Sequence, residues 1–203
     1  MNDSVLGDVS RETIERLELF AELTRKWTPK INLISRNTVP DLWARHIVDS
    51  AQLFQYAPTM PQHWVDIGSG GGFPGLVMAA MAAEKTPQTK FTLIESDQRK
   101  STFLRSAARE MGVEVTVISD RVESCEPQQA DVLTARALSA LGELFPYITR
   151  HVRPSGIAIL PKGKNHAQEI VDARLHWRFD VQSYQSTTED LARILVVKDI
   201  ERD

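Results

Sequence analysis

Apolar residues recur along the N-terminal part of the chain with helical spacing. Over residues 10–27 they return every three or four positions, which predicts an amphipathic helix with Ser10 as its N-cap. A second helix is predicted over residues 39–56, with Pro40 near its start. We expect these helices to form an N-terminal cap, residues 1–60, within the same compact unit as the rest of the chain.

After the cap, short apolar runs alternate with helical patterns. The runs are HWVDIG, FTLIES, VEVTVIS, DVLTARA and GIAILPKG. Helices are predicted between them over residues 76–84 and 97–111, the second with Asp97 as N-cap and Gly112 at its C-terminal end. This alternation predicts a mostly parallel sheet with crossover helices, in an α/β domain of residues 61–203.

Two final apolar runs, VQSYQS and ARILVVKD, flank the polar turn Thr187 to Asp190. They predict an antiparallel hairpin that closes the sheet. Because ligands of open α/β sheets bind beyond the carboxyl ends of the strands, we expect the site in the loops that follow the five parallel strands.

Composition and charge narrow the classes of function. The 203 residues suffice for one sizeable domain, and a net charge of −3 excludes a globally basic nucleic-acid binder, so any such role must be local. Cys125 is the only cysteine, which excludes an internal disulfide and a CxxC zinc site, and we predict no metal. Without a leader-like N-terminus or an apolar stretch long enough for a membrane, we expect a cytoplasmic monomer.

A glycine-rich stretch, VDIGSGGGFPG, joins the first predicted strand to the next helix. Phe73 stands where a nicotinamide-binding GxGxxG motif needs a small residue. The GxGxG spacing is instead typical of S-adenosylmethionine-dependent methyltransferases: Gly68, Gly70 and Gly72. Bare backbone lets the methionine and ribose of that cofactor approach closely, and Asp66 could orient its amino group. The alternative is a purely structural connection.

The next two loops support the same cofactor. Glu95 ends the run FTLIES, where a carboxylate can accept hydrogen bonds from both ribose hydroxyls. After the third run, DRVE offers an acidic edge and an apolar wall suited to adenine: Asp120, Val122 and Glu123. Each feature has a structural alternative, a helix cap for Glu95 and an ordinary polar loop for DRVE. In this order, the three loops predict S-adenosylmethionine binding.

The loop after the fourth run bears on the methyl acceptor. Amine methyltransferases usually carry (N/D)PP(Y/F) there, whereas this chain has TARALSAL. Methylation of cytosine carbon needs a cysteine nucleophile, and Cys125 lies in ESCEP without a proline–cysteine motif. An acceptor with a lone pair and no proton to remove, such as guanine N7, needs only in-line positioning. A small-molecule methyltransferase and a non-catalytic binding module remain as alternatives.

Several polar residues have both a functional and a structural interpretation. Arg136 follows the fourth run at the expected cleft, where it would face the cofactor carboxylate or RNA unless it forms a structural salt bridge. Arg45 and Asp49 are four residues apart and could pair on a helix surface. For His46 a structural role is the simpler interpretation, because the proposed chemistry transfers no proton.

The cap carries a local excess of positive charge. Residues 25–46 hold one acidic residue, Asp41, against five basic ones: Arg25, Lys26, Lys30, Arg36 and Arg45. We interpret this as a surface that can face RNA, with a merely solvated surface as the alternative. Other basic residues that could extend it are Arg99, Lys100, Arg105, Lys162 and Lys164.

Seven short motifs together resemble one family. NLIS, RHIVDS, VDIGSGGGFPG, LIES, SDRVE, ARAL and LPKG occur in the order and spacing of the RsmG family of small-subunit rRNA guanine-N7 methyltransferases, formerly called GidB. The resemblance covers almost the whole chain. It implies a class I S-adenosylmethionine-dependent methyltransferase with a Rossmann-like fold and helices beside the cofactor cleft. It also implies methylation of a guanine in a conserved loop of 16S rRNA near the decoding site, with the RNA free, in an assembly intermediate or in the small subunit.

The resemblance also assigns residues. Added to Gly70 and Glu95, the cofactor contacts are Gly68, Phe73, Val122, Glu123 and Arg136. Residues expected to position the reacting groups, with no general base among them, are Asn32, Arg45, His46 and Arg136. Two positions depart from the usual family pattern, Ile34 in place of threonine and Ala135 in place of serine, which puts fine substrate contacts in doubt.

Overall fold

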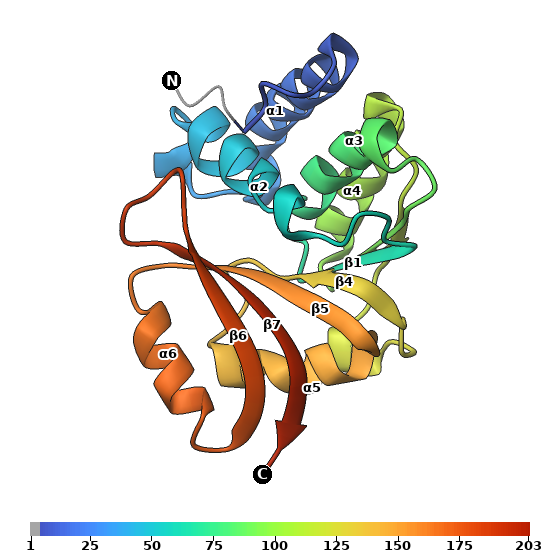
Figure 1. The fold of residues 1–203 in the computed structure, drawn as a ribbon. Helices are drawn as coiled ribbons and strands as arrows, with labels where there is room; N and C mark the ends of the chain where they lie inside the picture. The colour runs from blue at the N-terminus through green and yellow to red at the C-terminus, as the bar shows by residue number, and fades with distance from the viewer. Residues whose placement is uncertain (1–4) are drawn as a thin grey trace.

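The computed structural model describes residues 5–203 as an α/β fold with helices on both faces of one sheet (Figure 1). The strands are β1 (His63–Ile67), β2 (Lys90–Ile94), β3 (Thr116–Ile118), β4 (Ala130–Thr134), β5 (Val152–Lys162), β6 (Trp177–Gln185) and β7 (Arg193–Arg202). The α-helices are α1 (Arg11–Ile31), α2 (Asp49–Ala51), α3 (Gly75–Lys85), α4 (Gln98–Met111), α5 (Leu141–His151) and α6 (His166–Ala173).

The sheet has seven strands in the order β3-β2-β1-β4-β5-β7-β6. Strands β1 to β5 run parallel, and β7 is antiparallel to both of its neighbours, β5 and β6. The predicted α/β class with a C-terminal antiparallel hairpin is therefore confirmed. Among the residues described, no helix has both the length and the apolar character needed to cross a lipid bilayer.

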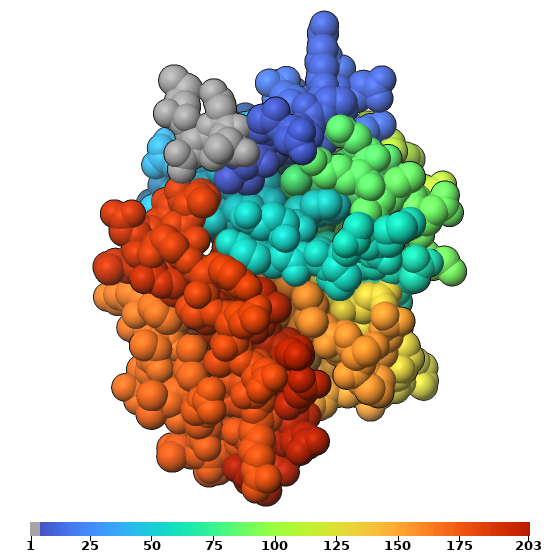
Figure 2. Space-filling view, in the orientation of Figure 1, coloured from blue at the N-terminus to red at the C-terminus, as the bar shows by residue number. Residues whose placement is uncertain are grey.

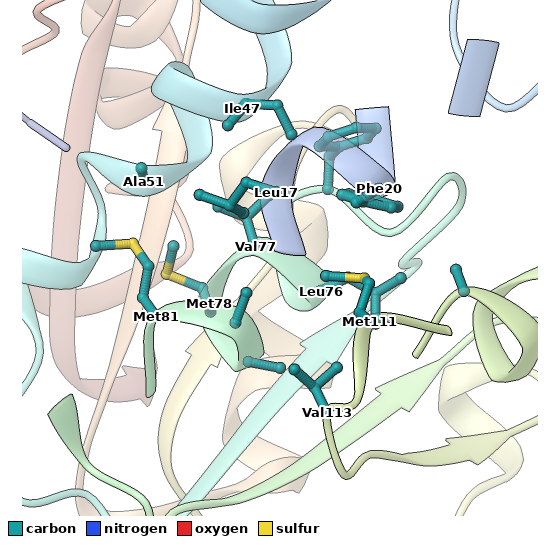
Figure 3. Packing of buried hydrophobic residues seen from close by; sticks show 14 of the residues in the cluster. Leu17, Phe20, Ile47, Ala51, Leu76, Val77, Met78, Met81, Met111 and Val113 are labelled. Atoms are coloured by element: carbon teal, nitrogen blue, oxygen red, sulfur yellow. The ribbon is translucent and has the colours of Figure 1, made fainter. Parts of the chain in front are cut away.

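Two apolar clusters cover the two faces of the sheet. On one face the cap packs with α3 and α4, where buried side chains from α1, the cap and α3 meet: Leu17, Phe20, Ile47, Ala51, Met78 and Met81 (Figure 3). On the other face α5 and α6 cover a second cluster. The first cluster holds residues from both sides of residue 61, so the cap and the sheet share a core.

The first helix begins where the sequence predicts. The Ser10 hydroxyl accepts a hydrogen bond from the Thr13 N–H, and Glu84 of α3 accepts from the Thr13 hydroxyl at 2.6 Å. The helix continues through Pro29 to Ile31, with only Thr24 and Thr28 of its last two turns buried. A longer α1 brings the residues after it to the carboxyl edge of the sheet.

The second predicted helix, residues 39–56, is wrong as a single α-helix. The segment contains a π-helix over Trp43–Val48, then α2 and a short 3-10 turn at Phe54–Tyr56; another 3-10 turn, Arg36–Thr38, precedes it. In a π-helix, residues five apart share a face. Leu42 and Ile47, five apart, are both fully buried, so packing selects the wider turn.

Other elements differ from the sequence prediction at their ends. Strand β4 stops at Thr134, earlier than the run DVLTARA, because the chain turns at Ala137, which has a φ of 53°. The third strand is shorter than VEVTVIS, and β5 begins before GIAILPKG. Helix α5, which contains Pro146, and helix α6 were not predicted.

The turn between β6 and β7 is fastened to the cap. The Gln52 side chain is 1% exposed; its carbonyl oxygen accepts from the Thr187 N–H at 2.9 Å, and its amide donates to the Ser186 hydroxyl at 3.2 Å. Figure 2 shows the orange-red C-terminal segment lying directly against the blue and cyan cap. A buried amide therefore couples the end of the sheet to the N-terminal helices.

Strand β5 contains a glycine that leaves no room for a side chain. A Cβ on Gly156 would lie 2.5 Å from Val152 Cγ1 and 2.6 Å from the Ala130 carbonyl oxygen. We expect G156A to lower the free energy of unfolding by about 1–3 kcal/mol, because the strand backbone must shift. The control is G142A in α5, where a Cβ would meet nothing closer than 3.6 Å and should be neutral or stabilising by up to about 1 kcal/mol. Equal denaturation midpoints for the two variants would contradict this.

Candidate functional site

A cavity of about 770 Å³ lies at the carboxyl ends of β1 to β4. Strand β1 has β2 on one side and β4 on the other, and the chain crosses from β3 past β1 to reach β4; open α/β sheets bind ligands where their strand order reverses in this way. Most residues predicted for the site line this cavity: Gly68, Gly70, Phe73, Glu95, Val122, Glu123, Arg136, Arg45 and His46. The cap forms part of its wall.

The glycine loop after β1 forms the floor of the cavity. Gly70 has a φ of 55°, a conformation that side-chain-bearing residues rarely adopt. Gly71 passes so close to the cap that a Cβ would lie 2.8 Å from the Leu33 carbonyl oxygen. The loop can take this path only because its glycines have no side chains. Their absence also lets a ligand approach the peptide groups of the loop.

Glu95 is a buried carboxylate, 8% exposed, at the end of β2. Its Oε2 accepts from the Gly70 N–H at 2.7 Å and its Oε1 from the Asp97 N–H at 2.8 Å. Each carboxylate oxygen keeps a further lone pair, so both can also accept from ligand hydroxyls. The cap of α4 is Asp97, whose Oδ1 accepts from the Arg99 and Lys100 N–H groups, so helix capping does not account for Glu95.

The loop after β3 presents Val122 and Glu123 to the cavity. It is held from behind by the end of α5, where the His151 ring Nε2 lies 2.9 Å from the Val122 carbonyl oxygen and Arg150 donates twice to the Cys125 carbonyl. Burial raises the pKa of the Cys125 thiol, as expected for an unreactive structural cysteine. The apolar wall is thus fixed in place.

Arg136 lies at the centre of a polar cluster between the cavity and the cap. Its Nη2 donates to His46 Nδ1 at 2.8 Å, and its Nη1 lies 3.3 Å from the Arg45 carbonyl oxygen and 3.4 Å from Asp49 Oδ2. The guanidinium also stacks over the Phe73 ring at 5.3 Å. Arg136 therefore both lines the cavity and forms a salt bridge. The alternative that Arg45 and Asp49 pair on a helix surface is not found among residues 5–203, where the Asp49 carboxylate pairs with Arg136.

The contacts of His46 define its protonation. A guanidinium can only donate, so Nδ1 must accept from Arg136 and Nε2 carries the hydrogen, which it donates to the Thr38 hydroxyl at 2.8 Å. Thr38 in turn donates to the Ser35 carbonyl. Burial, Arg136 and Arg45 lower the pKa of His46 to about 4. His46 is therefore neutral near pH 7 and holds Arg136 in position.

The His46 ring should titrate near pH 4 in the wild-type protein, as measured by NMR. In an Arg136→Met variant the pKa should lie closer to the ordinary value of 6.5, because one cause of the shift is removed. Since the folded-state pKa is lowered, the stability that His46 contributes is present above pH 6.5 and is lost as the pH falls toward 4. A wild-type midpoint near 6.5 would contradict the hydrogen-bonded arrangement.

Asp66, at the end of β1, does not line the cavity. Its Oδ1 accepts from the Thr134 hydroxyl at 2.7 Å, and burial raises the pKa of Asp66 to about 6. The structure therefore does not bring this carboxylate to the place where we expected it to orient the cofactor amino group. It joins β1 to β4 behind the glycine loop.

Asn32 also lies outside the cavity. It ends α1 in the left-handed conformation, with a φ of 51°, and its N–H donates to the Thr28 carbonyl at 2.9 Å. Asparagine adopts this conformation more readily than most residues. The turn directs Leu33 and Ile34 into the cavity wall. A direct role of Asn32 toward the acceptor stays a prediction.

The predicted basic surface is only partly exposed. Arg45 and Lys100 line the cavity, and the cap residues Arg25, Lys26, Lys30 and Arg36 are exposed. The expectation that Lys162 extends this surface is wrong, because its side chain is 9% exposed and its ammonium lies 2.8 Å from Glu169. It belongs to the interior of the site and not to a solvent-facing patch.

Three site residues were not predicted from the sequence. Thr38 holds His46, Gln52 holds the β6–β7 turn, and the Thr188 hydroxyl of that turn donates to Asp49. Thr188 and Asp49 are 139 residues apart, so no local pattern could bring them together. The only signal was the polar turn itself.

Solved methyltransferases share the fold. An S-adenosylhomocysteine-bound methyltransferase from Podospora anserina, PaMTH1, matches with a TM-score of 0.64 and 13% identity, covering 94% of this chain and 88% of that one. TYW2 of M. jannaschii, in complex with S-adenosylmethionine, matches with a TM-score of 0.57 and 11% identity, covering 87% and 80%. The fold is the Rossmann-like fold of S-adenosylmethionine-dependent methyltransferases. The glycine loop and the spare lone pairs of Glu95 suit this cofactor.

Sequence comparison identifies the family. A protein from Ruegeria sp. (strain TM1040), named ribosomal RNA small subunit methyltransferase G, is 53% identical over 195 residues, which cover 96% of this chain and 95% of the relative. One of the same name from Cereibacter sphaeroides (strain ATCC 17029 / ATH 2.4.9) is 48% identical over 200 residues, covering 98% and 97%. The family model described as GidB, rRNA small subunit methyltransferase G, matches residues 13–195. The chain therefore belongs to the rRNA small subunit methyltransferase G family.

Proposed function

We propose that the protein transfers a methyl group from S-adenosylmethionine to N7 of one guanine, in a conserved loop of 16S rRNA near the decoding site. The observation that carries the proposal is the cavity itself. Its lining combines two groups of residues. Glu95 and the glycine loop suit the cofactor, and the cluster around Arg136 suits the acceptor. We place the reaction in the cytoplasm, together with that RNA.

The residues of the first three loops would hold the cofactor. Glu95 accepts from the ribose hydroxyls, Val122 packs against adenine, and the loop of Gly68 and Gly70 surrounds the methionine part. Arg136 lines the same cavity and would face the carboxylate of the cofactor or the RNA. When bound, S-adenosylmethionine supplies an electrophilic methyl group on a positively charged sulfur.

The residues around Arg136 suit an acceptor that loses no proton. Guanine N7 would attack with its lone pair, and sulfur would keep the electrons of the broken carbon–sulfur bond, so the protein need supply no base. His46 is neutral with both ring nitrogens hydrogen-bonded, and Asp49 is held by Arg136 and Thr188. His46 and Asp49 therefore orient Arg136 and take no part in proton transfer.

A small-molecule acceptor would call for a closed apolar pocket over Arg136. The cavity is instead lined by charged side chains of both signs, with Arg45, Lys100 and Arg121 among the basic ones. The cap adds exposed basic residues: Arg25, Lys26, Lys30 and Arg36. This distribution favours a large anionic substrate such as RNA.

The test uses radiolabelled S-adenosylmethionine with three substrates: naked 16S rRNA, an assembly intermediate and mature small subunits. We expect label in one RNA position, identified by reduction and aniline cleavage, which breaks the chain at N7-methylguanosine. Affinity should fall with salt by about 0.7 log units per log unit of salt for each single-strand phosphate contact. Label on protein alone, or on a different base atom, would contradict the proposal.

A further inference from the structure

A second cavity of about 280 Å³ adjoins the first. The two share four lining residues: Asp49, Arg136, Ala137 and Glu189. Beyond this shared opening, the wall of the second cavity includes Ser139, Lys162 and Glu169. Since methyl transfer needs two ligands whose reacting atoms meet, a cavity that opens onto the cofactor cavity is where an acceptor would lie.

Lys162 and Glu169 form an anchored pair in this wall. The Lys162 ammonium lies 2.8 Å from Glu169 Oε2 and donates to the Ser139 carbonyl at 2.8 Å, which leaves one of its three N–H groups without a partner among residues 5–203. Glu169 Oε2 also accepts from the Leu141 N–H at 2.9 Å, whereas no partner for Oε1 is found in the same part of the chain. One free donor therefore lies beside one free acceptor.

We propose that the second cavity binds the target guanine and that this pair recognises its O6 and N1–H. Lys162 donates its third N–H to O6, and Glu169 Oε1 accepts from N1–H. Adenine presents the reverse pattern, an amino group in place of O6 and an unprotonated N1, so both contacts would be lost. The inference rests on the proposed function and adds how the base is selected.

The arrangement leaves the reacting atom free. N7 flanks O6 on the side away from N1, so a guanine held by O6 and N1 keeps N7 clear of the pair and available at the opening that Arg136 borders. A volume of about 280 Å³ suits a single base and not a stretch of nucleotides, so the base would be turned out of its RNA loop. The Ser139 hydroxyl, buried and without a hydrogen-bond partner among the described residues, offers a further polar contact.

The experiment uses small subunits reconstituted with 16S rRNA that carries guanosine, inosine or 2-aminopurine riboside at the target position. All three keep N7. Inosine keeps O6 and N1–H, whereas 2-aminopurine has neither. For the wild-type protein we expect inosine to react within a few-fold of guanosine and 2-aminopurine about 10- to 100-fold more slowly, because hydrogen bonds to charged groups are lost.

Two variants test the pair itself. K162M should slow methylation of guanosine about 10- to 100-fold and bring it close to the rate of 2-aminopurine, with cofactor affinity unchanged. E169Q replaces one carboxylate oxygen by an amide group that donates. If the remaining oxygen stays with Lys162, this donor faces the N1–H donor of guanine. Methylation of guanosine should then be at least 10-fold slower. K90M, at the exposed amino end of β2 and outside the lining of both cavities, is the matched control and should behave like the wild type.

The outcomes separate the two proposals. If the wild-type protein methylates no ribosomal guanine, the proposed function fails. If it does so, but folded K162M and E169Q keep the wild-type ratio of guanosine to 2-aminopurine, the assignment of Lys162 and Glu169 is overturned. Circular dichroism and cofactor calorimetry on each variant identify a misfolded protein, and the wild-type base series is informative by itself.

Discussion

Replacing Arg136 with methionine is expected to lower kcat/KM for small-subunit methylation about 100-fold or more. The guanidinium contacts His46, Asp49 and the Phe73 ring together, at the opening between the two cavities. Its loss would also leave the Asp49 carboxylate without its cationic partner. Because the two side chains are 19% and 21% exposed, we expect a cost below the about 3–5 kcal/mol of fully buried pairs. Methyl transfer from labelled cofactor and thermal unfolding measure the two effects.

The companion variants separate chemistry from stability. R136K should remain strongly impaired, because an ammonium cannot stack on Phe73 and donate to His46 and Asp49 in the fixed geometry of a guanidinium. In the double variant R136M/D49N the unpaired charge is removed, so stability should partly recover while activity does not. If R136M turns over like the wild type, Arg136 does not act at the reacting centre.

Replacing Glu95 with alanine is expected to weaken binding of S-adenosylmethionine by about 100-fold or more. Two hydrogen bonds from the cofactor to a carboxylate would be lost, each worth about 1.5–3 kcal/mol, and Gly70 would lose the acceptor that holds the glycine loop. E95Q keeps one oxygen and should be intermediate. Calorimetry with the cofactor and with S-adenosylhomocysteine provides the dissociation constants.

Asp97 supplies the control for Glu95. It lies two residues further on and caps α4 through the Arg99 and Lys100 N–H groups, without lining the cavity. D97A should therefore lower the free energy of unfolding, because the cap of α4 is lost, and leave cofactor affinity nearly unchanged. Equal losses of affinity in D97A and E95A would show that both act only through the start of α4.

The cofactor side of the site could be predicted because its signals are local. Gly68, Gly70, Glu95 and Val122 each follow directly after an apolar run, and the parallel topology brings the ends of such runs to one edge. Short local patterns thus predicted the fold class, and most of the residues predicted for the site line the cavity.

The acceptor side could not be predicted in the same way. The π-helix that turns His46 and Asp49 toward Arg136 depends on burial of Leu42 and Ile47, a tertiary effect that local spacing does not reveal. Lys162 was expected to extend the basic surface. No pattern in the neighbouring sequence indicates that it pairs with Glu169. Contacts between distant segments decide this half of the site.

The placement of β7 between β5 and β6 affects the order in which the chain can fold during translation. During translation β6 emerges first, yet its hydrogen-bonding partner in the sheet is the strand that follows it. Until residues 193–202 have left the exit tunnel, β6 has no edge to join, and the turn that brings Thr188 to Asp49 has no anchored base. A nascent chain can therefore assemble the cofactor half early, whereas the cavity that we propose for the RNA base is complete only after residues 193–202 have emerged.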